Sequence, residues 1–550
     1  MCLGGGAAAP LPGWSREMTA HLVDKEWDVI VVGAGMGGGV VGRRLAERGL
    51  SVLYVETGPN APRAEASEWM PDVEDPDERA ALGYWPRPIH QVIDGRSTTL
   101  YGPFGTGVGG TSAFYAATLE RPERHDIDDS AEIPHPTGGW PVSYDEMLPY
   151  FEMAEQILDV CGEPDPLTPD PPRTLRQAPP LSEGDAAMIA AFRREGLHPY
   201  RKHVGVRYLP GCAECFGRKC GRDCKMDGRS AGVEPALSTG RAALLDRCEI
   251  RALRGTRDRI THLEAVRGGE RLRLRARRFV LAAGTFGTPR ILLASTSADW
   301  PNGVANDSGV IGGNLMFKLY ERIAVWPERR ADFTGPVNTI SVRDFYQRDG
   351  VRYGHFQSMG LSASYGDIVK YLKERFDQST LRRLTPLRAF ARVPAFAGAK
   401  IFGDARIFQG LLEDLPYRHN RIVFDPARPE RIEFEYTLTA ELLARRRIFR
   451  RMIKTGLGRQ RSSYLHMGPE LSLSHACGTA RFGTDPRTSA FDASCKAHGI
   501  DNLYVSDASF MPTSTGINPS LTIAANALRV ADAIVAATQA RDAAGAQYGT

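Results

Sequence analysis

The feature that most constrains this chain is a glycine-rich turn between a strand and a helix near its N-terminus. Residues 27–32 are a run of mainly β-branched apolar residues, which predicts a buried parallel strand. Gly33, Gly35 and Gly38 follow in the pattern G-x-G-x-x-G, and a helical periodicity and a second apolar run, residues 51–55, come next. This order of strand, glycines, helix and strand is typical of a dinucleotide-binding unit.

Each residue of the unit has a physical task. Gly33 permits the tight turn, Gly35 lets the backbone approach a pyrophosphate, and Gly38 allows close packing of helix on strand. Glu56 ends the second strand, where an acid can accept hydrogen bonds from ribose hydroxyls. The motif alone does not separate FAD from NAD.

Length and composition set the frame. A chain of 550 residues exceeds what one core usually supports, so we expect two joined domains. A net charge of +4 is too small to favour nucleic-acid or membrane partners. No run reaches the roughly 18 apolar residues of a membrane span. Residues 1–24 lack a signal-peptide pattern, which predicts a disordered lead-in and a cytoplasmic, reducing location.

Three later segments extend the pattern. Residues 102–112 form a second glycine-rich loop, too long for a hairpin turn and suited to packing against a flat ligand. Residues 278–293 predict a strand, a glycine turn and a helix with Pro289 in its first turn. Residues 502–509 predict a strand that leads into a terminal apolar helix.

With these segments the chain resembles the glucose–methanol–choline (GMC) oxidoreductase family over residues 28–534, including the minor family segments 139–144 and 312–315. The resemblance implies an α/β fold, with a discontinuous Rossmann-like FAD-binding domain and an α+β substrate domain built on an antiparallel sheet. The implied FAD-binding pieces are 25–60, 95–130, 200–320 and 465–540. The implied substrate-binding pieces are 61–94, 131–199 and 320–465, with 541–550 as a tail.

The resemblance also implies roles for particular residues. Gly33, Gly35 and Gly38 match the pyrophosphate loop, and Glu56 matches the adenosine-ribose acid. The residues that match the remaining FAD contacts are Gly109, Gly110, Thr111 and Ser112 beside the flavin, Ile250 at the adenine, and Asp507 near the phosphate and ribityl chain. Members with covalent flavin carry a histidine in residues 102–115, and this chain has none, which implies non-covalent FAD.

Alcohol oxidation by a flavin needs a base for the hydroxyl proton and a group that holds the substrate oxygen. Histidine suits the first task because its pKa of about 6.5 is near working pH. Residues 474–479 match the catalytic histidine segment of the family, and Asn518 matches its partner position. The resemblance therefore implies His475 as general base and Asn518 as the substrate-orienting amide.

Four of the nine cysteines, Cys212, Cys215, Cys220 and Cys224, lie within thirteen residues. One interpretation is an iron–sulfur cluster on Cys215, Cys220 and Cys224, with Cys212 as a candidate fourth ligand. The spacing resembles that in some bacterial sugar dehydrogenases of the family, where the cluster carries electrons to an outside acceptor. The alternatives are a structural zinc site and disulfides or plain thiols.

The leading hypothesis is a FAD-dependent dehydrogenase that oxidises an alcohol group of a sugar, aminosugar or polyol, including a primary hydroxyl during aminoglycoside antibiotic biosynthesis. The alternative is an alcohol or sterol oxidase that uses O2 and makes peroxide. A non-catalytic flavoprotein and an eliminating lyase are further classes. Residues 381–412 mix bulky apolar and basic side chains, which fits a helix covering the core or an amphipathic membrane-facing or gating segment.

Overall fold

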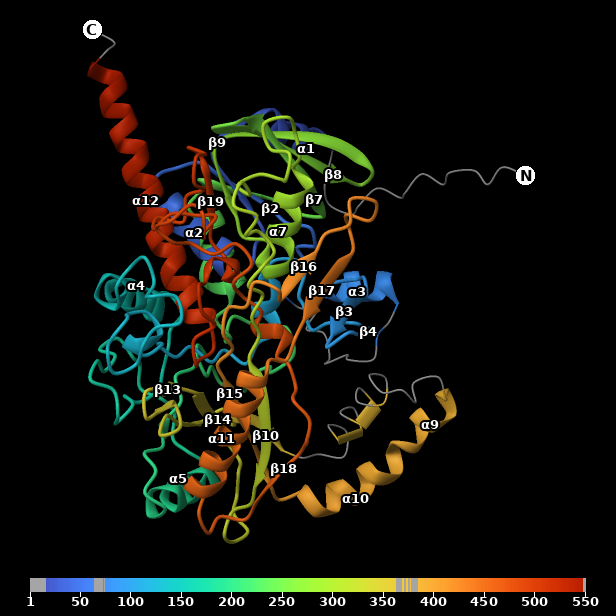
Figure 1. The fold of residues 1–550 in the computed structure, drawn as a ribbon, viewed down its shortest axis with the longest axis vertical. Coiled ribbons are helices and arrows are strands. Elements are labelled where there is room, and N and C mark those ends of the chain that lie inside the picture. Colours follow the sequence, from blue (N-terminus) through green and yellow to red (C-terminus); the bar gives the residue numbers. More distant parts are fainter. Residues whose placement is uncertain are drawn as a thin grey trace.

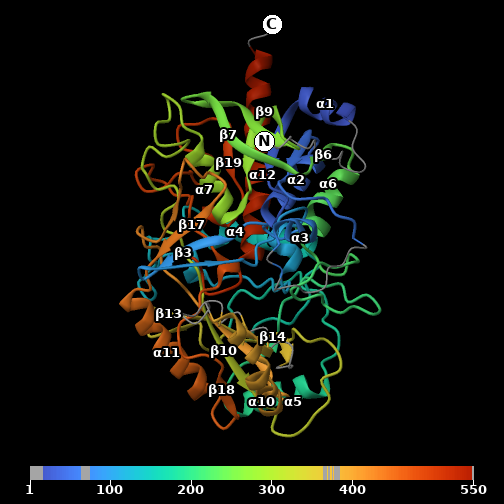
Figure 2. The same ribbon diagram turned by 90° about the vertical axis from the view of Figure 1, so that its right-hand side faces the viewer.

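A computed structural model describes residues 16–63, 73, 75–362, 368–369, 372–373, 376 and 384–547. The protein has two parts, each built on its own sheet (Figures 1 and 2). The upper part in Figure 1 holds both glycine-rich loops and the terminal helix, and the lower part holds an antiparallel sheet flanked by helices.

The first sheet has the strand order β6-β2-β1-β9-β8-β7, with β19 paired to β9. β1 is parallel to β2 and β9, and β2 is parallel to β6, so these strands end at one edge. The strands are β1 (Glu26–Val32), β2 (Val52–Val55), β6 (Ala242–Leu245), β7 (Cys248–Thr256), β8 (Arg259–Arg267), β9 (Glu270–Leu281) and β19 (Leu503–Val505).

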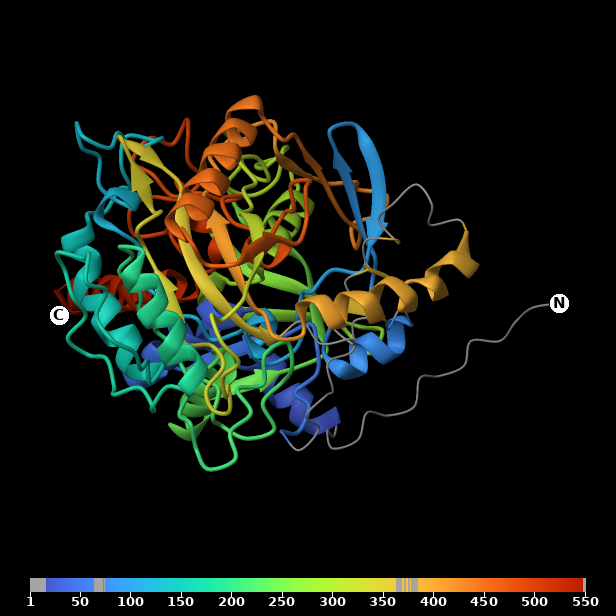
Figure 3. The ribbon, with the colours of Figure 1, turned by 90° about the horizontal axis from the view of Figure 1, so that it is seen from below.

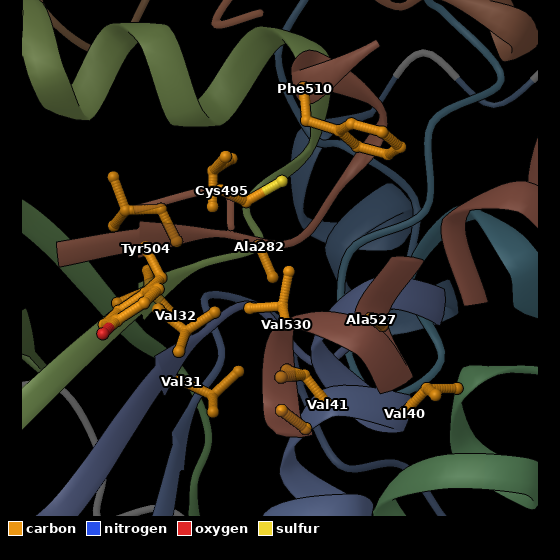
Figure 4. Close-up of a cluster of buried hydrophobic side chains, with 14 of the residues drawn as sticks. Val31, Val32, Val40, Val41, Ala282, Cys495, Tyr504, Phe510, Ala527 and Val530 are labelled. Atoms are coloured by element: carbon orange, nitrogen blue, oxygen red, sulfur yellow. The ribbon is translucent and has the colours of Figure 1, made fainter. Parts of the chain in front are cut away.

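Helices cover β1 and β2 because these strands are apolar and buried on both faces. Val31 and Val32 of β1 lie near Val41 of α2 and Val530 of α12, in the core shown in Figure 4. The helices of this part are α1 (Arg16–Asp24), α2 (Met36–Glu47), α4 (Tyr144–Ile157), α6 (Glu234–Ser238), α7 (Gly284–Ala294) and α12 (Ser520–Gln547).

Three features near the ends of the chain differ from expectation. Residues 16–24, expected to be disordered, form α1, whereas residues 1–15 lie outside the described part. The expected tail from 541 is helical as far as Gln547. By length and composition the segment Ser520–Ala540 of α12 could cross a membrane, but 56% of that window is buried inside the protein, as in a core helix.

A fourth difference concerns α4, which the expected boundaries place in the substrate domain. Its Tyr144, Met147 and Phe151 lie three or four residues apart, so they share one helix face. All three are buried in the same core as β1, and α4 packs on α12. Burial of that face therefore assigns α4 to the part with the first sheet.

The second sheet has the order β18-β10-β15-β14-β11-β5, and every pair is antiparallel. Its strands are β5 (Tyr200–Arg201), β10 (Leu319–Val325), β11 (Ile340–Val342), β14 (Gly354–Ser362), β15 (Arg406–Leu412) and β18 (Ser462–Tyr464). The expected boundaries gave β5 to the flavin domain, but it pairs with β11 here. The core on the second sheet includes Phe192 from α5 (Glu183–Arg194) and Phe449 from α11 (Ala440–Gly456).

A four-stranded sheet of order β16-β17-β3-β4 joins the two parts. Its strands are β3 (Ile89–Ile93), β4 (Arg96–Leu100), β16 (Arg421–Val423) and β17 (Ile432–Tyr436). The structure also contains the helix α3 (Pro76–Leu82) and the strand pair β12 (Gln347–Arg348) and β13 (Val351–Arg352).

The stretch 381–412 divides into two unlike halves, apart from 381–383, which lie outside the described residues. Its first half forms α9 (Thr385–Phe390) and α10 (Arg392–Phe402), and α10 lies along the outside of the molecule (Figure 3). Phe390, Val393 and Phe396 are exposed there. Its second half is β15, which is buried throughout. The described residues of this stretch therefore form two helices and a strand, and not one helix covering the core.

The glycine turn generates a paired prediction on stability. A Cβ atom on Gly38 would lie 1.9 Å from the carbonyl oxygen of Gly33, whereas the nearest atom to one on Gly35 is 3.8 Å away. We expect Gly38→Ala to lower the free energy of unfolding by about 1–3 kcal/mol or more, because backbone must move to make room. Gly35→Ala should cost less, about 0.5–1 kcal/mol, because alanine is a poorer N-cap residue than glycine. Urea unfolding of the cofactor-free variants measures both, and equal losses would contradict the assignment.

Candidate active site

The glycine turn connects β1 to α2 and leaves one side of the backbone open. Gly33 has φ +101°, and a Cβ there would lie 2.3 Å from the carbonyl oxygen of Ala282 at the end of β9. Gly35 is the N-cap of α2, and no side chain caps that helix. An uncapped helix N-terminus presents backbone N–H groups and partial positive charge, which suits a pyrophosphate.

Glu56 ties the two glycine-rich loops together. One carboxylate oxygen accepts a hydrogen bond from the N–H of Ala34 at 2.8 Å, and the other accepts from Gly58 and Gly107, each at 2.9 Å. Burial raises the pKa of this carboxyl group, although the backbone donors oppose the shift. The sequence did not reveal this bracing. The ribose contact of Glu56 stays a prediction.

The second loop lies directly over the first. Gly109 and Gly110 have φ values of +98° and +52°, and a Cβ on Gly110 would lie 2.9 Å from the Cα of Gly35. The Ser112 hydroxyl donates to the carbonyl oxygen of Gly109 at 2.6 Å. Thr111 accepts a hydrogen bond from the N–H of Gly105 at 3.2 Å. The four predicted residues of this loop are thus gathered at the N-terminus of α2.

Ile250 and Asp507 reach the same edge of the sheet from other strands. The N–H of Cys248, which begins β7, donates to the carbonyl oxygen of Glu56 at 2.9 Å, so the buried Ile250 follows within two residues. Asp507 comes two residues after β19. Its carboxylate accepts from the N–H of Gly284 at 2.9 Å and the hydroxyl of Thr288 at 2.5 Å.

These residues fit a dinucleotide with a flavin. Ser509 and Thr522, which the sequence analysis did not single out, have buried hydroxyls with no hydrogen-bond partner in the described residues. They lie beside Asp507 and in the first turn of α12, respectively. A buried hydroxyl without a partner costs free energy unless something else satisfies it, and phosphate or ribityl oxygens can do so.

His475 and Asn518 come together although 43 residues separate them. The Asn518 amide lies 3.4 Å from His475 Nε2, at hydrogen-bond distance. His475 Nδ1 and Asn518 Oδ1 are buried and have no partner among the described residues. The pair therefore holds unused hydrogen-bonding capacity for a third polar group.

Backbone pairing fixes the position of His475. It ends a short 3-10 helix, Leu473–His475. The next residues run beside Met316, since the N–H of Cys477 donates to the carbonyl oxygen of Met316 at 3.0 Å. The Thr285 hydroxyl at the start of α7 donates to the carbonyl oxygen of Ala476 at 2.7 Å. The histidine segment is thereby held against both α7 and the segment that leads into β10.

Two neighbours of His475 escaped the sequence analysis. Lys318 is fully buried, and its ammonium donates to the carbonyl oxygen of Ser514 at 2.6 Å. Tyr320 meets the imidazole edge-on, with ring centroids 5.8 Å apart, and its hydroxyl is 3.3 Å from the Ser474 hydroxyl. Lys318 and Tyr320 come three and five residues after the family segment 312–315. That segment was the only signal in the sequence that could have pointed to them.

The electrostatics around His475 favour a neutral imidazole. Desolvation, and then the charge of Lys318, hold the pKa of His475 well below 6.5. A neutral imidazole has a free lone pair, which a proton acceptor needs. The arrangement can therefore accept a proton from a hydroxyl group placed between His475 and Asn518.

The four clustered cysteines line a cavity of about 140 Å³. The described part of the chain contains no group of three or more histidine, cysteine or acidic residues that could hold a metal ion. The expectation of an iron–sulfur cluster is not supported.

Comparison with known proteins agrees with this geometry. Two models of the GMC oxidoreductase family match residues 27–319 and 425–527. The 6'''-hydroxyparomomycin C oxidase of Streptomyces lividus is 29% identical over 96% of this chain and 94% of its own, and the paromamine 6'-oxidase of Streptomyces fradiae is 27% identical over 93% and 92%.

Among solved structures, the pyridoxine 4-oxidase from Mesorbium loti superposes with a TM-score of 0.61 at 19% identity, covering 92% of this chain and 99% of its own. That likeness confirms the expected fold class. Together the two matched models cover well over half of the sequence. The chain therefore belongs to the GMC oxidoreductase family, whose members use FAD to oxidise CH–OH groups.

Proposed function

We propose that the protein oxidises a hydroxyl group of an aminosugar, sugar or polyol to a carbonyl, and that a primary hydroxyl of an aminoglycoside intermediate, which becomes an aldehyde, is the favoured substrate. The observation that carries the oxidation is the His475–Asn518 pair, in which the Asn518 amide nitrogen lies 3.4 Å from His475 Nε2, the two atoms that a substrate hydroxyl would contact. The substrate class rests on the two aminoglycoside oxidases that resemble the chain over nearly its whole length.

His475 acts as the general base in this proposal. Its Nε2 accepts the hydroxyl proton, and the long 3.4 Å contact with Asn518 gives way to the substrate oxygen. Asn518 then donates to that oxygen and orients the carbon. FAD, when bound, supplies the hydride acceptor at flavin N5. Lys318 opposes early protonation of the base.

We propose non-covalent FAD held by the residues gathered at the carboxyl edge of the first sheet. The electrons then leave either to an external acceptor, as in a dehydrogenase, or to O2, as in an oxidase. The names of the two aminoglycoside relatives favour the oxidase as the second candidate. Anaerobic reduction of the flavin by substrate, followed by admission of air, distinguishes them, because an oxidase reoxidises rapidly and releases peroxide.

The base assignment predicts the effect of His475→Ala. The variant should retain FAD, but substrate should reduce the flavin about 10²–10⁴-fold more slowly, the usual contribution of a general base. Stopped-flow measurement of flavin bleaching without oxygen, with paromamine, fructose, sorbitol and cholesterol as a panel, tests both the base and the substrate class. His498→Ala is the matched control, because His498 contacts Ser489 and not the His475–Asn518 pair. Near-normal bleaching in His475→Ala would refute the assignment, and bleaching by cholesterol alone would refute the substrate class.

The charge of Lys318 predicts a shift in pH dependence. Desolvation, and then the charge of Lys318, lower the pKa of His475, so the base is neutral and active down to low pH. Lys318→Met removes the charge and should raise the pKa of His475 toward its ordinary value. Activity would then be lost at a higher pH as the solution is acidified. The profile of kcat/KM against pH measures this shift, and an acid limb that does not move would show that Lys318 has only a structural role.

A further inference from the structure

One face of the second sheet borders the pair of His475 and Asn518. The Tyr320 ring of β10 meets the imidazole of His475 edge-on, with ring centroids 5.8 Å apart. The N–H of His355, near the start of β14, donates to the carbonyl oxygen of Gly516 at 3.0 Å, two residues before Asn518. Strands β10 and β14 therefore reach both members of the pair.

The register of the strands fixes which side chains share this face. Tyr320 lies directly opposite Leu411 of β15, and Leu411 lies opposite His355, so these three residues form a first row. Residues two apart in a strand point to the same face. The residues of the second row, paired with one another in the same way, are Arg322, Gln409 and Gln357. A strand rises about 3.3 Å per residue, so the second row lies about 7 Å beyond the first.

Apolar side chains limit this face on two sides. On the opposite face of the sheet, Phe408 of β15 packs on Phe192 of α5, with ring centroids 5.5 Å apart. Beyond the second row, the ring of Phe402 from α10 stacks on Trp326 at 5.5 Å, in an apolar cluster that includes Ile407. The polar second row therefore lies between an apolar cluster and the candidate catalytic pair.

The two rows hold hydrogen-bonding capacity that the described residues do not use. Gln357 and Gln409 are only 1% and 8% exposed, and neither side-chain oxygen Oε1 has a hydrogen-bond partner in the described part of the chain. Nδ1 of the fully buried His355 likewise has none there. Buried polar atoms without partners cost free energy, and a polar ligand can satisfy them.

The charges of the two rows are balanced. Nη1 of Arg322 lies 2.9 Å from Oε1 of Glu470, which neutralises the guanidinium. Burial lowers the pKa of His355 to about 3, so its imidazole is neutral near pH 7. An amide both donates and accepts hydrogen bonds, as a hydroxyl group does. Two neutral amides therefore suit hydroxyl groups, whereas an ammonium or carboxylate group would need an opposite charge.

We propose that Gln357 and Gln409 form a subsite that binds the non-reacting hydroxyl groups of the substrate and so determines specificity for a polyhydroxylated compound. The inference rests on the proposed function, in which His475 and Asn518 receive the reacting hydroxyl. The rest of the substrate then extends across the sheet face to the second row. There each amide donates from Nε2 and accepts at Oε1. The two glutamines take no part in the transfer of the proton or the hydride.

The test replaces each amide by a thioether of similar length, as Gln357→Met and Gln409→Met, in the FAD-bound protein. Stopped-flow bleaching of the flavin without oxygen gives the apparent Kd and the saturated rate separately. The polyhydroxylated probes are paromamine and methyl glucoside, and benzyl alcohol is a primary alcohol without further hydroxyls.

We expect the apparent Kd of both polyhydroxylated probes to rise about 5- to 100-fold, because a substrate hydroxyl loses its buried partner. The saturated rate and the behaviour of benzyl alcohol should stay near those of the parent. Gln460→Met is the matched control, because Gln460 is also buried but donates to Glu328 at 2.9 Å.

Thermal unfolding of the same variants separates recognition from a structural role. An unpartnered buried amide destabilises the substrate-free protein, so both Gln→Met substitutions should maintain or raise Tm while they weaken binding. Amides that brace the sheet would give the reverse, a lower Tm with an unchanged Kd, and that result would overturn the subsite.

Calorimetric titration of paromamine and methyl glucoside into the FAD-bound His475→Ala protein measures binding with little turnover. Binding that weakens with either glutamine substitution supports the subsite, even if neither compound bleaches the parent flavin and the proposed function fails. Bleaching of the parent by paromamine with an unchanged Kd in both glutamine variants would overturn the subsite alone. No measurable binding of either compound would also overturn it, and bleaching by cholesterol alone would overturn both hypotheses.

Discussion

The N-terminus of α2 is the point on which the rest of the structure depends, because four distant segments meet there by direct backbone contact. A Cβ on Gly37 would lie 1.6 Å from the carbonyl oxygen of Ser506, and one on Gly39 would lie 2.3 Å from that of Gly228. Gly33 has the same relation to Ala282, and Gly110 lies against Gly35. Only glycine permits these approaches, so the glycines set the spacing of the whole first part.

This close packing also explains how the candidate catalytic residues His475 and Asn518 come to lie together. Ser506 and Asp507 continue into the loop that carries Asn518, and the N–H of Gly478 donates to the carbonyl oxygen of Ala508 at 3.1 Å. The two chain segments that carry His475 and Asn518 therefore lie at the same edge of the first sheet as the glycine turn. The proposed cofactor and base sites share one framework, and Lys225 bonds residues 215–218 to Tyr115 beside it.

Much of the first part could be predicted from local sequence. Residues 27–56 contain strand, turn, helix and strand in order, and the pattern fixes their pairing because few folds accommodate it. The placement of α4 was wrong because its apolar face is equally suited to either core, and only the packing on α12 decides between them. The cysteine spacing allows a metal cluster, whereas the folded positions of the described cysteines do not form a group that could hold a metal ion.

The sequence by itself determined the dinucleotide-binding turn, the family and the identity of the candidate base and amide, since each of these resides in a short contiguous motif. The tertiary structure alone decided that burial and then the charge of Lys318 lower the pKa of His475, and that Glu56 bonds both glycine-rich loops. These properties depend on distances between residues far apart in the chain. Burial and electrostatic coupling arise only when folding brings such residues into one low-dielectric environment.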